Sequence, residues 1–70
     1  MNIVARNIER IIAEKGFLKK GVAKRAGITE QQLCDMLKGR KVIKAEHVPS
    51  LSTALGVQPS ELFVQTDKED

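Results

Sequence analysis

The stretch VAKRAGITEQQL, residues 22–33, decides how this chain folds. Apolar residues before Gly27 repeat with the period of a helix, and so do the apolar residues after it. Gly27 itself suits the left-handed conformation in which many helices end. Thr29 followed by Gln32 is the pattern of a capping box, which marks the start of a new helix. The stretch therefore predicts two helices that are joined by a turn of about four residues.

Glycines divide the rest of the chain in the same way. Gly16, Gly39 and Gly56 each follow a segment whose apolar residues have helical spacing, and glycine is common just past the end of a helix. No segment alternates between apolar and polar residues as a half-buried strand does. The sequence therefore predicts an all-α fold. Its five short helices are expected over residues 3–15, 19–26, 29–38, 45–55 and 59–63.

Each expected helix has one apolar face, and these faces should form the core. In the first helix, Asn7 and its polar neighbours should lie largely on the outer side. Pro49 is unfavourable inside a helix, so the fourth helix either begins near Val48 or bends there. The residues expected to face inward are Val4, Ile8, Ile11, Ile12, Leu18, Val22, Ala23, Ala26, Leu33, Met36, Leu37, Val48, Leu51, Ala54 and Leu55.

Length and composition limit the chain to one small globular domain. The 70 residues are 41% apolar and 30% charged, and only Phe17 and Phe63 are aromatic, so the core must be aliphatic. We expect this domain at residues 1–64, followed by an acidic, flexible tail at residues 65–70. A domain of this size has little room for a deep cleft, which argues against an independent enzyme.

Positive charge is concentrated in the middle of the chain. The whole sequence has a net charge of +3. Residues 15–44 contain nine Lys or Arg residues and two Asp or Glu residues, which gives this part a charge of +7. So dense a basic block indicates a polyanionic partner such as nucleic acid.

The sequence contains no clear signal for other chemistry. Cys34 is the single cysteine, which fits a reducing compartment and an inert thiol, with a redox-sensing thiol as the alternative. His47 has no second metal ligand at helical spacing, and no glycine-rich phosphate loop occurs. No apolar run reaches the length of about 18 residues that a membrane span needs. We therefore expect a cytoplasmic protein that is not an enzyme, without catalytic residues, cofactor, metal or small-molecule ligand.

Three segments resemble the Cro/phage-repressor type of helix-turn-helix regulators, also called the xenobiotic-response-element type. The segments are FLKKGVAKRAGIT at residues 17–29, KGR at 38–40 and ALGVQPSELF at 54–63. The resemblance implies a compact lambda-repressor-like DNA-binding domain whose helix 29–38 enters the major groove of double-stranded DNA. Ile12 and Leu37 depart from the family, since many members have an Arg–Glu pair there, but an apolar contact need not be less stable.

The resemblance and the helical period together indicate which residues touch DNA. Glutamine can hold adenine and a carboxylate can accept from cytosine, although the acids could instead pair with nearby Lys or Arg. The expected base contacts are Glu30, Gln31, Gln32 and Asp35. Flanking lysines and arginines, and the Thr29 hydroxyl, suit the phosphates. The expected phosphate contacts are Lys19, Lys20, Thr29, Lys38, Arg40 and Lys41.

These features predict a sequence-specific DNA-binding transcriptional regulator, a repressor that reads an operator half-site with helix 29–38. We expect a weak homodimer that is dimeric on DNA, because one reading helix covers only a few base pairs. Dimer contacts are expected from the leftover apolar residues, although Leu62 and Phe63 could belong to the core instead. These residues are Val57, Leu62, Phe63 and Val64. Two alternatives are an antitoxin-type autoregulator and a protein-interaction module that kept the fold without reading DNA.

Overall fold

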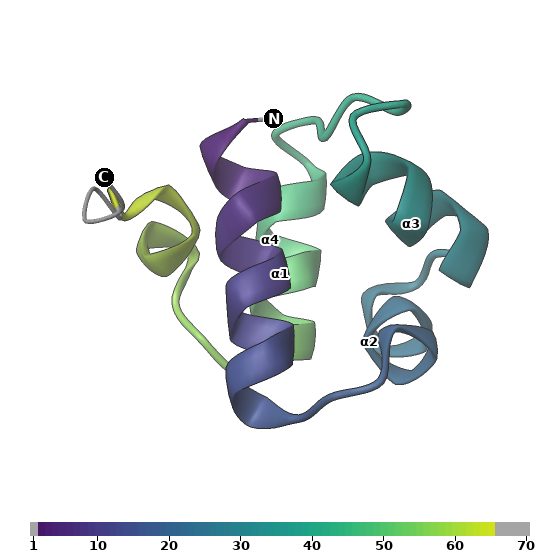
Figure 1. Ribbon diagram of the computed structural model, residues 1–70, viewed down its shortest axis with the longest axis horizontal. Helices are drawn as coiled ribbons and strands as arrows, with labels where there is room; N and C mark the ends of the chain where they lie inside the picture. The colour runs from purple at the N-terminus through teal and green to yellow at the C-terminus, as the bar shows by residue number, and fades with distance from the viewer. Residues whose placement is uncertain (1, 66–70) are drawn as a thin grey trace.

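The computed structural model describes residues 2–65, and this part of the chain consists of helices joined by loops (Figure 1). The elements are α1 (Ile3–Lys15), α2 (Lys19–Ala26), α3 (Glu30–Leu37), α4 (His47–Leu55) and the 3₁₀ helix η1 (Pro59–Phe63). The predicted all-α fold is confirmed, but the fifth element is not an α-helix, since so short a segment closes the tighter 3₁₀ turn. Of the predicted tail, only Gln65 lies within the described residues.

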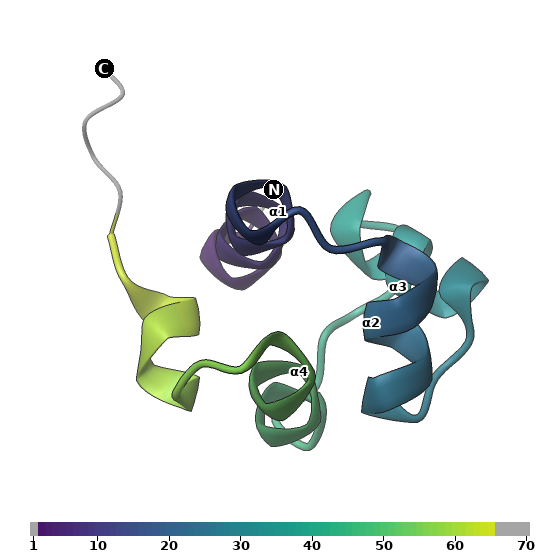
Figure 2. The same cartoon turned by 90° about the horizontal axis from the view of Figure 1, so that it is seen from below.

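Two helices form the centre of the domain. α1 and α4 lie side by side, α2 and α3 lie on one side of them, and η1 lies on the other (Figure 1 and Figure 2). α2 packs on both α4 and α3, whereas η1 packs on α1 and α4. The pair α2 and α3 therefore lies at the opposite end of the domain from η1.

The core is aliphatic, as the composition predicted. Leu33, Leu55 and Leu62 are fully buried, and burial of a leucine side chain stabilises the fold by about 1.5–3 kcal/mol. Of the residues predicted to face inward, Ala26 and Val48 are half-buried and pack against the core. The buried apolar residues are Val4, Ala5, Ile8, Ile11, Ile12, Val22, Ala23, Leu33, Met36, Leu37, Leu51, Ala54, Leu55 and Leu62. They come from every element, so the core fixes the position of α3.

The prediction that Leu18 faces the core is wrong, because its side chain is 76% exposed. Leu18 is the N-cap of α2 and has an extended backbone, with φ −93° and ψ 138°. The helical period that places Val22 and Ala23 inside therefore does not extend to it. Its neighbour Phe17 packs against the core instead.

The prediction that Asn7 lies on the outer side of α1 is also wrong, because Asn7 is only 1% exposed. Its Nδ2 donates to the carbonyl oxygens of Leu62 and Val64, at 2.8 and 3.0 Å. Its Oδ1 accepts from Arg10 Nη2 at 3.1 Å. η1 packs on α1, and the buried Asn7 amide obtains its hydrogen-bond partners from carbonyl groups at and just after the end of η1.

α4 begins at His47, which lies between the two starting points that the sequence allowed. Pro49 is thus the third residue of the helix, where backbone amides have no partner within the helix and proline costs little. His47 Nδ1 accepts from the backbone amide of Lys44 at 3.0 Å, and Ser52 Oγ donates to Pro49 O at 3.0 Å. His47 therefore has a structural role at the start of α4.

Candidate nucleic-acid interface

α3 begins at a complete capping box. The turn before it passes through Gly27, whose φ of 79° is left-handed, and the Ile28 amide donates to Ala23 O at 3.0 Å. Thr29 Oγ1 accepts from the Gln32 amide at 3.0 Å, and Gln32 Oε1 accepts from the Thr29 amide at 2.9 Å. These bonds fix the direction of α3 at its first residue, and they occupy the side-chain oxygen of Gln32.

The outer side of α3 contains a chain of polar contacts between three residues. Gln31 Nε2 donates to Asp35 Oδ1 at 3.0 Å, and Arg40 Nη1 lies 3.9 Å from the same oxygen. The Asp35 side chain is 29% exposed and the Arg40 side chain is 68% exposed. The structure thus brings together two predicted base contacts and one predicted phosphate contact. Asp35 pairs with a nearby arginine, which was the alternative that the sequence left open.

Basic side chains gather in the segment 38–41, directly after α3. Gly39 has a left-handed φ of 81°, which turns the chain away from the helix axis. The backbone amides of Arg40 and Lys41 then both donate to Asp35 O, at 2.8 and 3.2 Å. Lys38, Arg40 and Lys41 are exposed. The segment 38–41 therefore carries three positive charges next to the polar side of α3.

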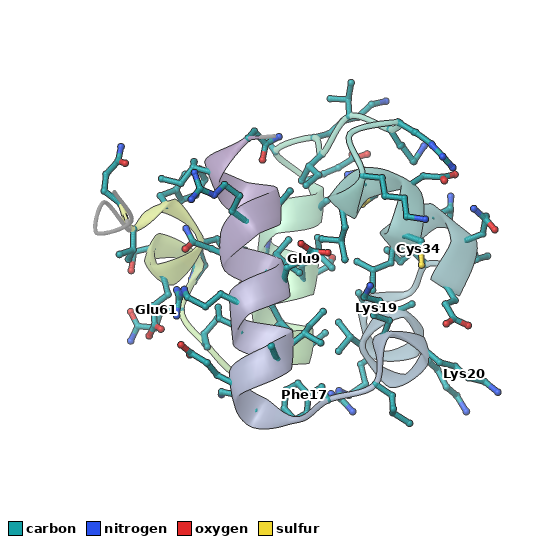
Figure 3. All side chains as sticks on the ribbon, viewed as in Figure 1. Glu9, Phe17, Lys19, Lys20, Cys34 and Glu61 are labelled. Atoms are coloured by element: carbon teal, nitrogen blue, oxygen red, sulfur yellow. The ribbon has the colours of Figure 1, made fainter. Side chains whose placement is uncertain are left out.

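The two lysines at the start of α2 have different surroundings. Lys20 is exposed and points away from the domain (Figure 3). Lys19 is half-buried and lines, together with Glu9 and Phe17, a shallow depression between α1 and α2. Of the two predicted phosphate contacts, Lys20 is therefore more accessible to a partner.

Two exposed residues of the basic block bind the end of α4. Arg25 Nε donates to Ala54 O and Lys15 Nζ donates to Leu55 O, both at 3.1 Å. The last carbonyl groups of a helix have no partner within the helix, so these two bonds satisfy them. Both cations also lie over the Phe17 ring, with Arg25 Cζ at 5.1 Å and Lys15 Nζ at 5.9 Å from its centroid. We call Lys15, Phe17 and Arg25 the α4 clamp, because they join α1 and α2 to the end of α4.

Metal sites and membrane spans are not found in the part of the chain that the structure describes. Residues 2–65 contain no group of three or more His, Cys, Asp or Glu residues that could hold a metal ion. None of the helices in this range is long and apolar enough to cross a membrane. Cys34 has a free thiol and is half-buried on α3 (Figure 3). The polar side of α3 and the exposed basic residues around it form the candidate site.

Comparisons with known proteins agree with this geometry. Residues 7–68 match the family of Cro/C1-type HTH (helix-turn-helix) DNA-binding domains. The chain belongs to this family. An uncharacterized HTH-type transcriptional regulator of Sinorhizobium fredii, y4dJ, is 33% identical over 66 residues, which cover 94% of this chain and 86% of that protein. The crystal structure of the restriction-modification controller protein C.AhdI from Aeromonas hydrophila has the same fold, with a TM-score of 0.80 at 22% identity. That similarity covers 86% of this chain and 87% of C.AhdI.

Membership of the Cro/C1-type family confirms the predicted class, a DNA-binding transcriptional regulator with DNA as its partner. The helix-turn-helix of this Cro/C1-type domain is α2, the turn through Gly27, and α3. Most of the predicted DNA contacts lie on α3, at its cap or in the segment 38–41, and the others are at the start of α2. Their individual contacts with bases and phosphates stay predictions.

Sequence reasoning missed three residues that shape this Cro/C1-type domain. Asn7 has a usable signal, because it lies four residues from both Ile3 and Ile11 and so shares their apolar stripe. Lys15 and Arg25 were counted with the basic block. Their carbonyl partners lie 40 and 29 residues away, so no local pattern indicates the α4 clamp.

Proposed function

We propose that this Cro/C1-type regulator is a sequence-specific repressor that reads an operator half-site with α3. The observation that carries the proposal is the position of Gln31, which is exposed in the first turn of α3 while Leu33 and Leu37 are buried. A glutamine amide has both a donor and an acceptor, the combination that adenine requires in the major groove. A repressor bound at such a site blocks the access of RNA polymerase to overlapping DNA.

The residues around α3 hold the phosphates in this proposal. Lys20 and the three cations of the segment 38–41 are exposed and flank the reading helix. Thr29 Oγ1 accepts a hydrogen bond within the capping box, which leaves its own O–H free to donate to a phosphate oxygen. Such contacts fix the register of the protein on DNA without reading its sequence.

The repressor binds its operator as a dimer in this proposal. Two reading helices related by two-fold symmetry reach successive major grooves about 34 Å apart. Phe63 and Val64 are 53% and 46% exposed and support a small self-association surface, whereas Leu62 is fully buried and belongs to the core. Sedimentation with an operator duplex should give two chains per duplex. A single chain per duplex would exclude the dimer.

Selection of bound duplexes from a random pool tests the proposal directly. We expect the pool to become enriched in a pseudo-palindrome, since two symmetric half-sites are read. The enriched duplex then defines the operator for all further measurements, and a scrambled duplex of the same composition serves as the reference. Failure to enrich any sequence would contradict sequence-specific reading.

A pair of variants separates base reading from phosphate binding. Gln31→Ala should weaken operator binding by about 1–3 kcal/mol and leave scrambled-duplex binding nearly unchanged. Lys41→Ala should weaken binding to both duplexes alike and reduce the salt slope by about one. Equal loss on both duplexes for Gln31→Ala would move the reading role to Gln32 or end the proposal.

A protein-interaction module is the second candidate, and one observation favours it. Glu30 and Asp35 place two acidic groups on or beside the outer side of α3, where they repel phosphates. A salt series of duplex binding distinguishes the two functions. A steep fall of affinity with salt supports DNA binding, whereas absence of binding at low salt supports the interaction module.

A further inference from the structure

We propose that Asp35 is a positioning residue for base recognition, whose carboxylate orients the Gln31 amide and thereby sets which base Gln31 prefers. The proposal rests on the proposed function, the reading of DNA by α3. It assigns to Asp35 a role through Gln31 and Arg40 in place of the predicted base contact of its own.

The hydrogen bond between the two side chains determines which end of the Gln31 amide faces Asp35. A carboxylate offers only acceptors, so the amide nitrogen and not the oxygen must face it. The observed Nε2–Oδ1 distance of 3.0 Å fits this arrangement. One of the two N–H groups of Gln31 is used in this bond. The second N–H and Oε1 are left available, and the inference requires that the N–H trans to Oε1 is the one that binds Asp35, because the other N–H then lies on the same edge as Oε1.

That free edge is complementary to adenine. Its N–H can donate to adenine N7 while its oxygen accepts from the adenine N6 amino group. If the amide were flipped, its N–H would face the adenine N6 amino group and its oxygen would face N7, and neither pair can form a hydrogen bond. An unrestrained, exposed glutamine must also lose rotamer freedom when it binds, whereas one already held by Asp35 loses less. Asp35 therefore favours adenine over other bases at the position that Gln31 reads.

Asp35 also connects the reading residue to the basic segment 38–41. Its backbone carbonyl accepts from the amides of Arg40 and Lys41, and its carboxylate lies 3.9 Å from Arg40 Nη1. Arg40 offsets part of a negative charge that would otherwise repel the DNA backbone. The carboxylate thus opposes DNA affinity in general while it increases selectivity among sequences. Removal of Asp35 should therefore change affinity and selectivity in opposite directions.

Two substitutions at this position form a matched pair. Asp35→Ala and Asp35→Asn both remove the charge, so both should raise affinity for the scrambled duplex by roughly 2- to 8-fold at 0.1 M salt. Only asparagine keeps an oxygen that accepts from the Gln31 amide. The preference for the base read by Gln31 should fall about 2- to 10-fold in Asp35→Ala and be largely kept in Asp35→Asn.

The measurement is fluorescence anisotropy with the selected operator and with three duplexes that carry the other bases at the position sensitive to Gln31→Ala. The double variant Gln31→Ala/Asp35→Ala should have the same base preference as Gln31→Ala alone, because Asp35 acts through Gln31. Thermal melting followed by circular dichroism checks folding. A purely structural role would lower the Tm and weaken all four duplexes alike, without a difference in base preference.

Two kinds of result overturn the inference, and they are distinguishable from each other. If the wild type discriminates among the four duplexes and Asp35→Ala discriminates equally well, Asp35 does not position Gln31 although α3 still reads DNA. If the losses of base preference in Gln31→Ala and Asp35→Ala add up in the double variant, Asp35 does not act through Gln31 either. If the wild type itself shows no preference among the duplexes, the proposed reading function fails, and the inference fails with it.

Discussion

The α4 clamp and the segment 38–41 use the same type of side chain for different purposes. In the clamp, the exposed residues Lys15 and Arg25 donate to carbonyl groups at the end of α4. The cations of the segment 38–41 are exposed beside α3. The difference depends on the neighbouring groups, because the end of α4 offers unpaired backbone acceptors to Lys15 and Arg25.

The net charge of residues 15–44 does not by itself show where the positive side chains lie. Residues 15–44 have a charge of +7, and two of the positive charges, those of Lys15 and Arg25, lie at the end of α4 rather than beside α3. A neutral carbonyl partner does not cancel these charges, so the conclusion of a polyanionic partner is unchanged. A count of basic residues therefore gives an upper limit to the number of cations beside α3.

Removal of the three cations in the segment 38–41 should have the largest effect. Each lost phosphate contact reduces the salt slope by about 0.9, so Lys38→Ala/Arg40→Ala/Lys41→Ala should weaken binding to every duplex roughly 10²- to 10³-fold at 0.1 M salt. Stability should change little, because exposed side chains contribute little to it. A salt series on operator and scrambled duplexes measures the slope. An unchanged slope would mean that the segment does not contact phosphates.

Arg25→Met should lower the stability of the domain and leave the salt dependence of DNA binding unchanged, the reverse of the triple variant. The free energy of unfolding should fall by about 0.5–1.5 kcal/mol, because an exposed charged donor to a helix-end carbonyl is lost while methionine keeps part of the packing on Phe17. The salt slope of DNA binding should stay constant. Urea denaturation followed by circular dichroism gives the first value and the salt series gives the second. A lower slope with unchanged stability would place Arg25 among the phosphate contacts.

Lys15→Met should have a smaller effect in the same direction. Both residues are exposed, but Lys15 Nζ lies farther from the Phe17 ring than the Arg25 guanidinium does, at 5.9 against 5.1 Å. A cation at the end of a helix typically contributes about 0.3–1 kcal/mol. The same urea titration tests this order of the two variants. A larger loss for Lys15→Met than for Arg25→Met would reverse our ranking of the clamp residues.

Cys34→Ser should have the smallest effect, because the half-buried thiol belongs to neither the clamp nor the segment 38–41. We expect operator affinity to change less than about twofold, since substitutions away from specific interactions have small effects. Binding is measured with reduced and with oxidised wild type beside the serine variant. Loss of binding that follows oxidation of the wild type only would support the alternative of a redox-sensing thiol.

The parts of the fold with local signals were predictable from the sequence. α1 and α2 have the predicted bounds, and α3 starts at the predicted cap, because Gly16, Gly27 and Thr29 act on their immediate neighbours. Leu18 was misplaced because the helical period was extended across the start of α2. The burial of Asn7 depends on η1, which lies more than 50 residues farther along the chain.

In the candidate site, the contact between neighbours on α3 was predictable from the sequence, and the contact with Arg40 was not. The helical period brings Gln31 and Asp35 to one side of α3, since residues four apart are neighbours on a helix. The approach of Arg40 to Asp35 follows from the left-handed Gly39 and from the bonds of the next two amides to the Asp35 carbonyl. The turn at Gly39 and these two backbone hydrogen bonds do not follow the helical period. The pairing of Asp35 with Arg40 could therefore not be derived from residue spacing.

Asn7 ties the end of the described fold to its beginning, across 55 and 57 residues. Contacts of this span cannot form on the ribosome until Val64 has left the exit tunnel, whereas α2 and α3 can already meet by then. Throughout that interval the place of Leu62 in the core is open to water. The nascent regulator therefore exposes apolar surface until η1 has formed and packed on α1. In that period, aggregation and capture by chaperones or proteases compete with folding.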